Sequence, residues 1–203
     1  MKHAGKILLT VLFSSAIFII AGCSCSKAGA KQEQTEIPKN ILDKSKEIIV
    51  AKTGEEFFEK YISPDYTKSK YVAPNYYLVY HFVIPDKKYV NEDITMTLDS
   101  LGNPIAGTPI VGIPDCNADE KNCTFNVDEE AIVHIAEANN FEKGVKPWTF
   151  EFMWSDKWQQ YAWHVRTVFN ESTGTNGYRG SGKELVIDPS NGAVLETSEW
   201  QVR

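Results

Sequence analysis

The first strong pattern along the chain is an apolar run near its start. Lys2 and Lys6 precede the apolar residues 7–20, and small residues follow, in the order of an export signal. A span of the hydrocarbon core needs about 20 apolar residues, and no positively charged stop follows this shorter run. We therefore expect a signal peptide at 1–22 rather than a transmembrane helix.

A polar segment follows the signal peptide, and a segment with helical periodicity follows the polar one. Residues 23–40 are small, polar and charged, which predicts a flexible tether. Apolar positions with helical spacing follow at 41–62, and Ser63-Pro64 ends them. Strict alternation at 76–84 and again at 94–98 predicts two strands, with turn residues at 99–103 and a short return segment after them.

A second helix and a second set of strands are predicted after residue 126. Asp128 is a good N-cap for a helix that ends near residues 139–140. Alternation at 150–154 and 161–169 predicts strands, and a glycine-rich loop is expected at 174–182. A strand at 185–187, a turn at 188–192 and a return strand at 193–195 complete the chain.

The two halves share this order of elements. The pattern predicts an α+β fold of two repeated units, each a helix packed on an antiparallel β-meander. The units are 41–112 and 127–203, joined by a linker loop at 113–126. Convergence of two unrelated α+β patterns would produce the same order, and the sequence leaves that alternative open.

The net charge and one loop motif bear on whether the partner is a nucleic acid or a nucleotide. Removing Lys2 and Lys6 with the signal peptide changes the formal net charge from −6 to −8. An acidic protein lacks the clustered cations that nucleic acids require, so we expect no nucleic-acid partner. Residues 177–183 have the spacing of a phosphate-binding loop, but Glu184 stands in the place of its Ser or Thr and a strand follows, so no nucleotide is expected.

Three of the four cysteines of the chain are considered for a disulfide. Cys116 and Cys123 bracket a short polar run, and export favours a disulfide between them. Closing so short a loop stabilises the fold by about 2–3 kcal/mol in the chain-entropy model. Cys25 is then an unpaired thiol in the tether.

The end of the signal peptide resembles a lipobox. Ile20-Ala21-Gly22-Cys23 is similar to the cleavage site of bacterial lipoproteins, whose cysteine carries the acyl chains, palmitate among them. The resemblance implies a lipid anchor on Cys23 and a place in the bacterial cell envelope. Ser24 after the cysteine implies the outer membrane.

The C-terminal half resembles a PepSY-type domain, the small α+β module of peptidase propeptides. The resemblance rests on Asp128-Glu129-Glu130, on Tyr161-Ala162-Trp163-His164-Val165, and on residues 185–195 with their Asn191-Gly192 turn. The N-terminal half matches only in outline, as a degenerate tandem copy. The resemblance implies contact with a peptide or protein, in some members protease inhibition, and no enzyme chemistry.

Candidate ligand-binding residues lie on the strands of the second half. Glu151, His164 and Arg166 fall on a polar face and could form a ligand-binding patch, although a half-buried strand position is the more common role of a histidine such as His164. Trp154 and Trp158, with Trp148 and Trp200, are either core aromatics or exposed binding residues. Residues 115–126 begin like a calcium loop but lack its glycine and closing Glu, so no metal or cofactor is expected.

The sequence thus predicts a non-enzymatic, membrane-anchored lipoprotein that binds a peptide or protein and restrains or modulates a protease. A glycan-binding accessory lipoprotein that uses exposed aromatics is the alternative. An enzyme ranks third, because no nucleophile lies in a strand-turn-helix elbow.

Overall fold

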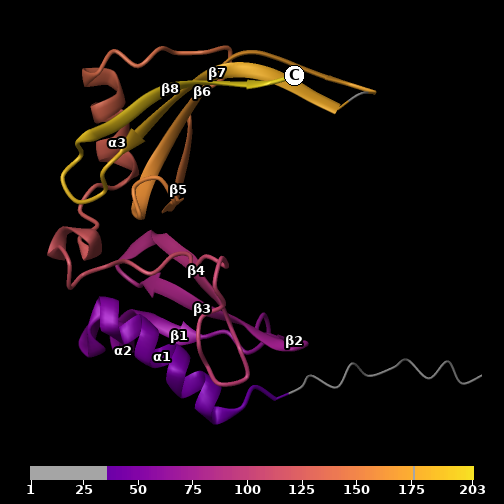
Figure 1. Ribbon diagram of the computed structural model, residues 1–203. Helices are drawn as coiled ribbons and strands as arrows, with labels where there is room; N and C mark the ends of the chain where they lie inside the picture. Colours follow the sequence, from indigo (N-terminus) through magenta and orange to yellow (C-terminus); the bar gives the residue numbers. More distant parts are fainter. Residues whose placement is uncertain (1–35, 176) are drawn as a thin grey trace, which may run out of the picture. The chain divides into compact units, whose positions relative to one another are not determined.

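The computed structural model describes residues 36–175 and 177–203, which belong to one compact unit. The predicted signal peptide at 1–22, Cys23 and most of the predicted tether lie outside these residues. The described part contains three α-helices and two antiparallel sheets of four strands each (Figure 1). None of its helices has the length and apolar character needed to cross a bilayer.

The first sheet is built around one long hairpin. Strand β3 (Asn75–Ile84) pairs with β4 (Lys87–Leu98) along one edge. Its other edge pairs with two short strands, β1 (Ile62–Pro64) and β2 (Lys70–Val72). Neither short strand was predicted, because three residues are too few to establish an alternating pattern.

Two helices cover this sheet. Helix α1 (Lys39–Thr53) buries Ile41, Ser45, Ile49 and Thr53, one residue per turn, against the strands. Gly54 follows it with φ 81°, a backbone conformation that ends the helix, and α2 (Glu55–Tyr61) begins at the next residue. The Ser45 and Tyr80 hydroxyls hydrogen-bond in this interface, and the Thr53 hydroxyl donates to the Ile49 carbonyl, so both polar positions of the α1 stripe have partners.

The second sheet is a simple meander. Its strands follow one another in space as in the sequence: β5 (Thr149–Ser155), β6 (Gln160–Gly174), β7 (Gly177–Ile187) and β8 (Val194–Val202). Helix α3 (Glu129–Ala138) precedes them, and the Asp128 side chain accepts a hydrogen bond from the Ala131 amide, as expected for the N-cap. Ile132 and Ala136 are the buried residues of this helix.

Both halves contribute to one hydrophobic core. The Phe82 ring of β3 lies 5.4 Å from the Tyr161 ring of β6 and 5.9 Å from the ring of Phe125 between the halves. The Trp163 ring lies 4.9 Å from that of Tyr89 on β4. Aromatic side chains from the predicted strands therefore form much of this core.

The α+β class is confirmed, but the repetition of two helix-on-meander units is not. The second sheet has the expected meander, whereas in the first sheet β1 and β2 share one edge of β3. The boundaries at 41–112, 113–126 and 127–203 stay a prediction.

The glycine-rich loop expected at 174–182 was wrong. Strands β6 and β7 continue through this segment and pair up to Gly174 and Gly177 (Figure 1). Gly182 lies between β6 and β8, opposite Trp200, and a Cβ there would lie under 3.0 Å from the Thr167 carbonyl oxygen. This glycine therefore provides space for close strand packing and not flexibility.

The predicted disulfide between Cys116 and Cys123 is confirmed. Its loop is held against the end of α1, where Asn117 donates from its backbone amide to the Lys52 carbonyl and from its side chain to the Ala51 carbonyl. These bonds satisfy carbonyls that a helix end leaves without partners. The loop is thus an extended cap of the first helix.

Candidate functional site

A polar patch lies on one face of β5, β6 and β7. Glu151 is the strand partner of His164, and Arg166 is the strand partner of Glu184. The Arg166 Nε lies 2.6 Å from a Glu184 oxygen, and its Nη1 lies 3.8 Å from a Glu151 oxygen. The fold therefore brings together the three predicted polar residues and adds Glu184.

Glu184 is the centre of this patch. Its carboxylate accepts from Arg166 and lies 3.1 Å from the His164 Nδ1. Burial opposes ionisation of Glu184, but the bonds from Arg166 and His164 outweigh it, so its pKa is lowered. The sequence did not single out Glu184, because its pairing depends on the register of β6 and β7.

The charges of the patch are largely satisfied by one another. Arg166 has two carboxylate neighbours, and the His164 side chain is only 13% exposed. The His164 Nε2 is buried and has no partner among the described residues. A ligand would have to displace these internal bonds, so we assign the patch a structural role.

The predicted tryptophans lie in different environments. Trp154 packs on the core, with its ring 5.3 Å from that of Tyr161 and its Nε1 bonded to Asp156. Trp158 is 37% exposed in the β5–β6 turn, with the Lys157 ammonium 5.3 Å from its ring centroid. Trp200 lies on β8, half-buried, and donates to the Thr167 carbonyl.

Glu92 on β4 is a second ionisable group that the sequence did not single out. It is half-buried, and burial together with the negative charges of Asp93 and Glu151 raises its pKa to about 7. Strand β3 pairs with β4 here, with Phe82 as the partner of Glu92. The carboxyl therefore lies where an apolar strand restricts its hydration.

We expect Glu92→Gln to stabilise the protein at pH 8 and to leave its stability unchanged at pH 4. The native state keeps the Glu92 proton up to about pH 7, whereas the unfolded chain releases it near pH 4.5. Native stability therefore falls as pH rises between these values. Solvent screening of a half-exposed carboxyl limits the gain at pH 8 to about 1–2 kcal/mol.

Urea unfolding of both proteins from pH 4 to pH 8 measures this difference. Asn91→Gln is the control, because it changes an exposed neighbour on the same strand without removing a titratable group. Equal stabilisation by Glu92→Gln at both pH values would contradict the assignment.

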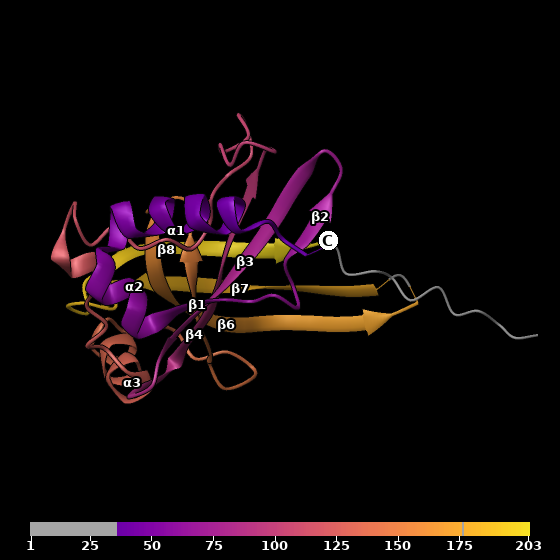
Figure 2. The same ribbon diagram turned by 90° about the horizontal axis from the view of Figure 1, so that it is seen from below.

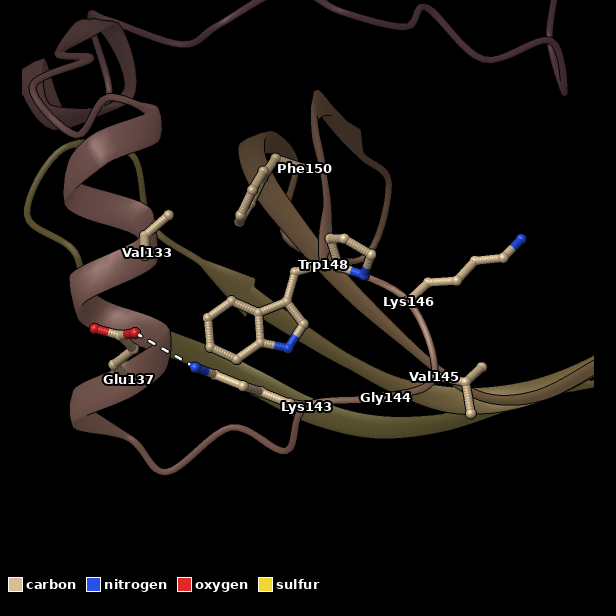
Figure 3. Close-up of a pocket in the computed structure, with 9 residues that line it drawn as sticks. Val133, Glu137, Lys143, Gly144, Val145, Lys146, Trp148 and Phe150 are labelled. Carbon is tan, nitrogen blue, oxygen red and sulfur yellow. Dashed lines mark ion pairs between the residues drawn. The ribbon is translucent and has the colours of Figure 1, made fainter.

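An open groove lies between α3 and the segment that leads into β5 (Figure 3). Its volume is about 510 Å³. Trp148 occupies its middle, between Val133 of α3 and Phe150 of β5, and Glu137 and Lys143 form an ion pair at 3.9 Å on its rim. The remaining lining comes from the segment 144–147.

Three contacts fix the segment that forms the groove. The Val145 amide donates to the Val168 carbonyl of β6 at 2.8 Å. Gly144 lies so close to β6 that a Cβ would be only 2.6 Å from the Thr167 Oγ1, a buried hydroxyl without a hydrogen-bond partner among the described residues. The Trp148 Nε1 donates to the Glu142 carbonyl, so its ring is held in place before any ligand binds.

The groove adjoins a sheet edge. Strand β5 is the first strand of the second sheet and, among the described strands, pairs only with β6, so it is an edge strand of this sheet. Val145 is 67% exposed and Trp148 is half-buried. Trp148 was one of four tryptophans that the sequence offered as binding candidates. Its place in the groove depends on the hydrogen bond between the Val145 amide and β6, which no local sequence pattern indicates.

The acidic side chains of the described residues serve turns and ion pairs rather than a cluster of metal ligands. Within 36–175 and 177–203, no group of three or more His, Cys, Asp or Glu residues could hold a metal ion. In the predicted calcium-like loop, Asp115 accepts from the Ala118 amide and Asp119 accepts from the Lys121 amide. These carboxylates serve the turn itself.

No protein family model, characterised protein or solved structure matches the chain. The PepSY resemblance therefore stays a prediction.

Proposed function

We propose that the protein is a non-enzymatic envelope lipoprotein that binds an extended peptide segment in the Trp148 groove. The observation that carries the proposal is the position of a preformed tryptophan-lined groove at the edge of β5. The partner is a peptide or an exposed segment of a protein, and a protease is one such partner. A lipid on Cys23 would hold the complex at the membrane.

An extended peptide fits this place for two reasons. A strand edge offers backbone donors and acceptors to a segment of any sequence, and side-chain pockets beside the edge supply selectivity. The groove provides such a pocket, with the apolar surfaces of Val133, Trp148 and Phe150 inside and charged groups on the rim. Buried aromatic anchors carry most of the binding energy in interfaces of this kind.

We expect Trp148→Ala to weaken peptide binding by about 2 kcal/mol or more, roughly a thirtyfold loss of affinity. The probe is a linear peptide recovered from a displayed peptide library with the purified chain. Titration by calorimetry gives the affinity of each variant. Thermal unfolding of Trp148→Ala reports whether the fold is intact.

Trp158→Ala is the matched control, because Trp158 is exposed but lies outside the groove lining. It is expected to retain the affinity of the wild type. If the library yields no peptide, or if both variants lose affinity equally, the groove is not the peptide site.

A lipid on Cys23 is the second element of the proposal. We expect Cys23→Ala to abolish labelling by radioactive palmitate and to release the chain from membranes, because the thiol that takes up diacylglycerol is lost. Cys25→Ser is the control and should keep both properties. Continued labelling and membrane retention of Cys23→Ala would contradict the anchor.

Glycan binding is the alternative function. The exposed ring of Trp158 favours it, because aromatic faces stack on sugar rings. Binding on a glycan array that is lost in Trp158→Ala and kept in Trp148→Ala would support this function over peptide binding.

A further inference from the structure

Three segments meet at one end of the first sheet. Tyr76 of β3 pairs with Leu98 of β4, so the turn between β2 and β3 and the turn after β4 lie at the same end. Gly102 in the second of these turns packs on α1, where a Cβ would lie 2.8 Å from the Lys44 side chain. The start of α1 is therefore at this end as well (Figure 2).

This end carries an exposed apolar surface. The end of β2 carries Tyr71 and Val72, and the turn to β3 carries Ala73 and Pro74, all of them exposed. Tyr71 is 43% exposed, Val72 51% and Leu101, in the neighbouring turn, 73%. We call residues 71–74 with Leu101 the apolar end.

The charges around the apolar end are mostly paired. Lys39 bonds to Asp43, and Lys44 bonds to Glu47, both within α1. The Lys70 ammonium lies 5.7 Å from the Tyr77 ring centroid. Asp99 lies in the turn of Leu101, where its carboxylate accepts from the Leu101 and Asn103 amides. Three lysines therefore face three carboxylates here, without the net negative charge of the whole chain, and anionic headgroups would meet little repulsion.

We propose that the apolar end lies in the headgroup region of the membrane that carries the lipid anchor. The inference rests on the proposed lipid on Cys23. Lys39, the first residue of α1, is 16 positions after Cys23, and an extended chain spans at most about 3.6 Å per residue, so α1 begins within about 58 Å of the bilayer. Tyr and aliphatic side chains are suited to the membrane interface, with apolar surface and a polar hydroxyl.

A second copy of the chain suits this surface less well. Stable protein interfaces bury about 800 Å² on each partner, which one short turn and a leucine cannot supply. The membrane, in contrast, is brought near the apolar end by the anchor itself. Insertion of a narrow turn also leaves the Trp148 groove, in the second half, available for a partner.

Fluorescence quenching by labelled lipids tests the proposal. The full lipidated chain with Cys25→Ser has one site for an environment-sensitive thiol dye when Val72→Cys, Leu101→Cys or Val202→Cys is added. Each protein is reconstituted in vesicles of phosphatidylethanolamine and phosphatidylglycerol that contain lipids with a spin label near the headgroup. Val202 is the matched control, because it is 46% exposed on β8 of the second sheet.

We expect dyes at positions 72 and 101 to be quenched severalfold more strongly than the dye at position 202. Equal quenching at the three positions, on protein with lipid on Cys23, would overturn membrane contact and leave the anchor and the groove untouched. Shielding of position 72 without vesicles, in Cys23→Ala and increasing with protein concentration, would indicate self-association and would also overturn the proposal. Failure of the anchor is distinguishable, because it appears as missing lipid on Cys23.

Discussion

Replacing Trp163 by alanine is expected to lower the free energy of unfolding by about 3–5 kcal/mol, the range for large aromatic residues removed from a core. Trp163 is 1% exposed, and its Nε1 donates to the Val127 carbonyl at 2.8 Å. Its ring also lies 5.4 Å from that of Phe152. Loss of the side chain would leave a cavity and a buried carbonyl without its donor. Urea unfolding followed by circular dichroism measures the change.

Two further variants separate these causes. Trp163→Phe keeps most of the apolar volume but removes the donor, so we expect an intermediate loss of about 1–3 kcal/mol. Trp158→Ala removes the same side chain from an exposed turn and should change stability by about 0.5 kcal/mol or less. Equal losses for Trp158→Ala and Trp163→Ala would contradict the division between core and exposed tryptophans.

Gly182→Ala is expected to destabilise the second sheet by about 2–3 kcal/mol, although it adds only one methyl group. The new Cβ would lie under 3.0 Å from the Thr167 carbonyl oxygen, and 2.9 Å from the Trp200 indole. Trp200 could rotate away, but the backbone of β6 cannot move without breaking its pairing with β7. Thermal unfolding measures the loss, and near-ultraviolet circular dichroism reports the environment of Trp200.

Gly174→Ala is the matched control, since a Cβ at Gly174 would meet no atom within 4 Å. It should change stability by about 0.5 kcal/mol or less. If Gly182→Ala proved as mild as Gly174→Ala, the close packing of Thr167 and Trp200 around Gly182 would be wrong.

Local patterns predicted the elements whose determinants are local. Asp128 marks the start of α3 because its carboxylate can bond to an amide three residues later, and this rule needs only the sequence. The strands β3, β5 and β6 were predicted from alternation, because one face of each is buried. The disulfide was predicted from the short spacing between Cys116 and Cys123 and from the expected export of the chain.

Features that depend on strand pairing were not predictable in the same way. Glycine is typical of loops and also of strand positions that another group approaches closely. Only the position of Trp200 opposite Gly182 shows that Gly182 is of the second kind. The groove likewise depends on the bond between the Val145 amide and β6, which links segments far apart in sequence. The place of Glu184 in the polar patch also depends on strand pairing, because the register of β6 and β7 sets it opposite Arg166.

The shared aromatic core has a consequence for how the chain reaches its native state. Phe82 packs on Tyr161, so contacts that complete the core of the first half are made by residues roughly 80 positions later. Such non-local contacts slow folding, because a long loop must close before the contacts form. During synthesis or translocation from the N-terminus, α1 and α2 can cover part of the apolar face of β3, but the surroundings of Phe82 would stay incomplete until β6 has emerged. A chaperone that holds exposed apolar strands would be most valuable in this interval.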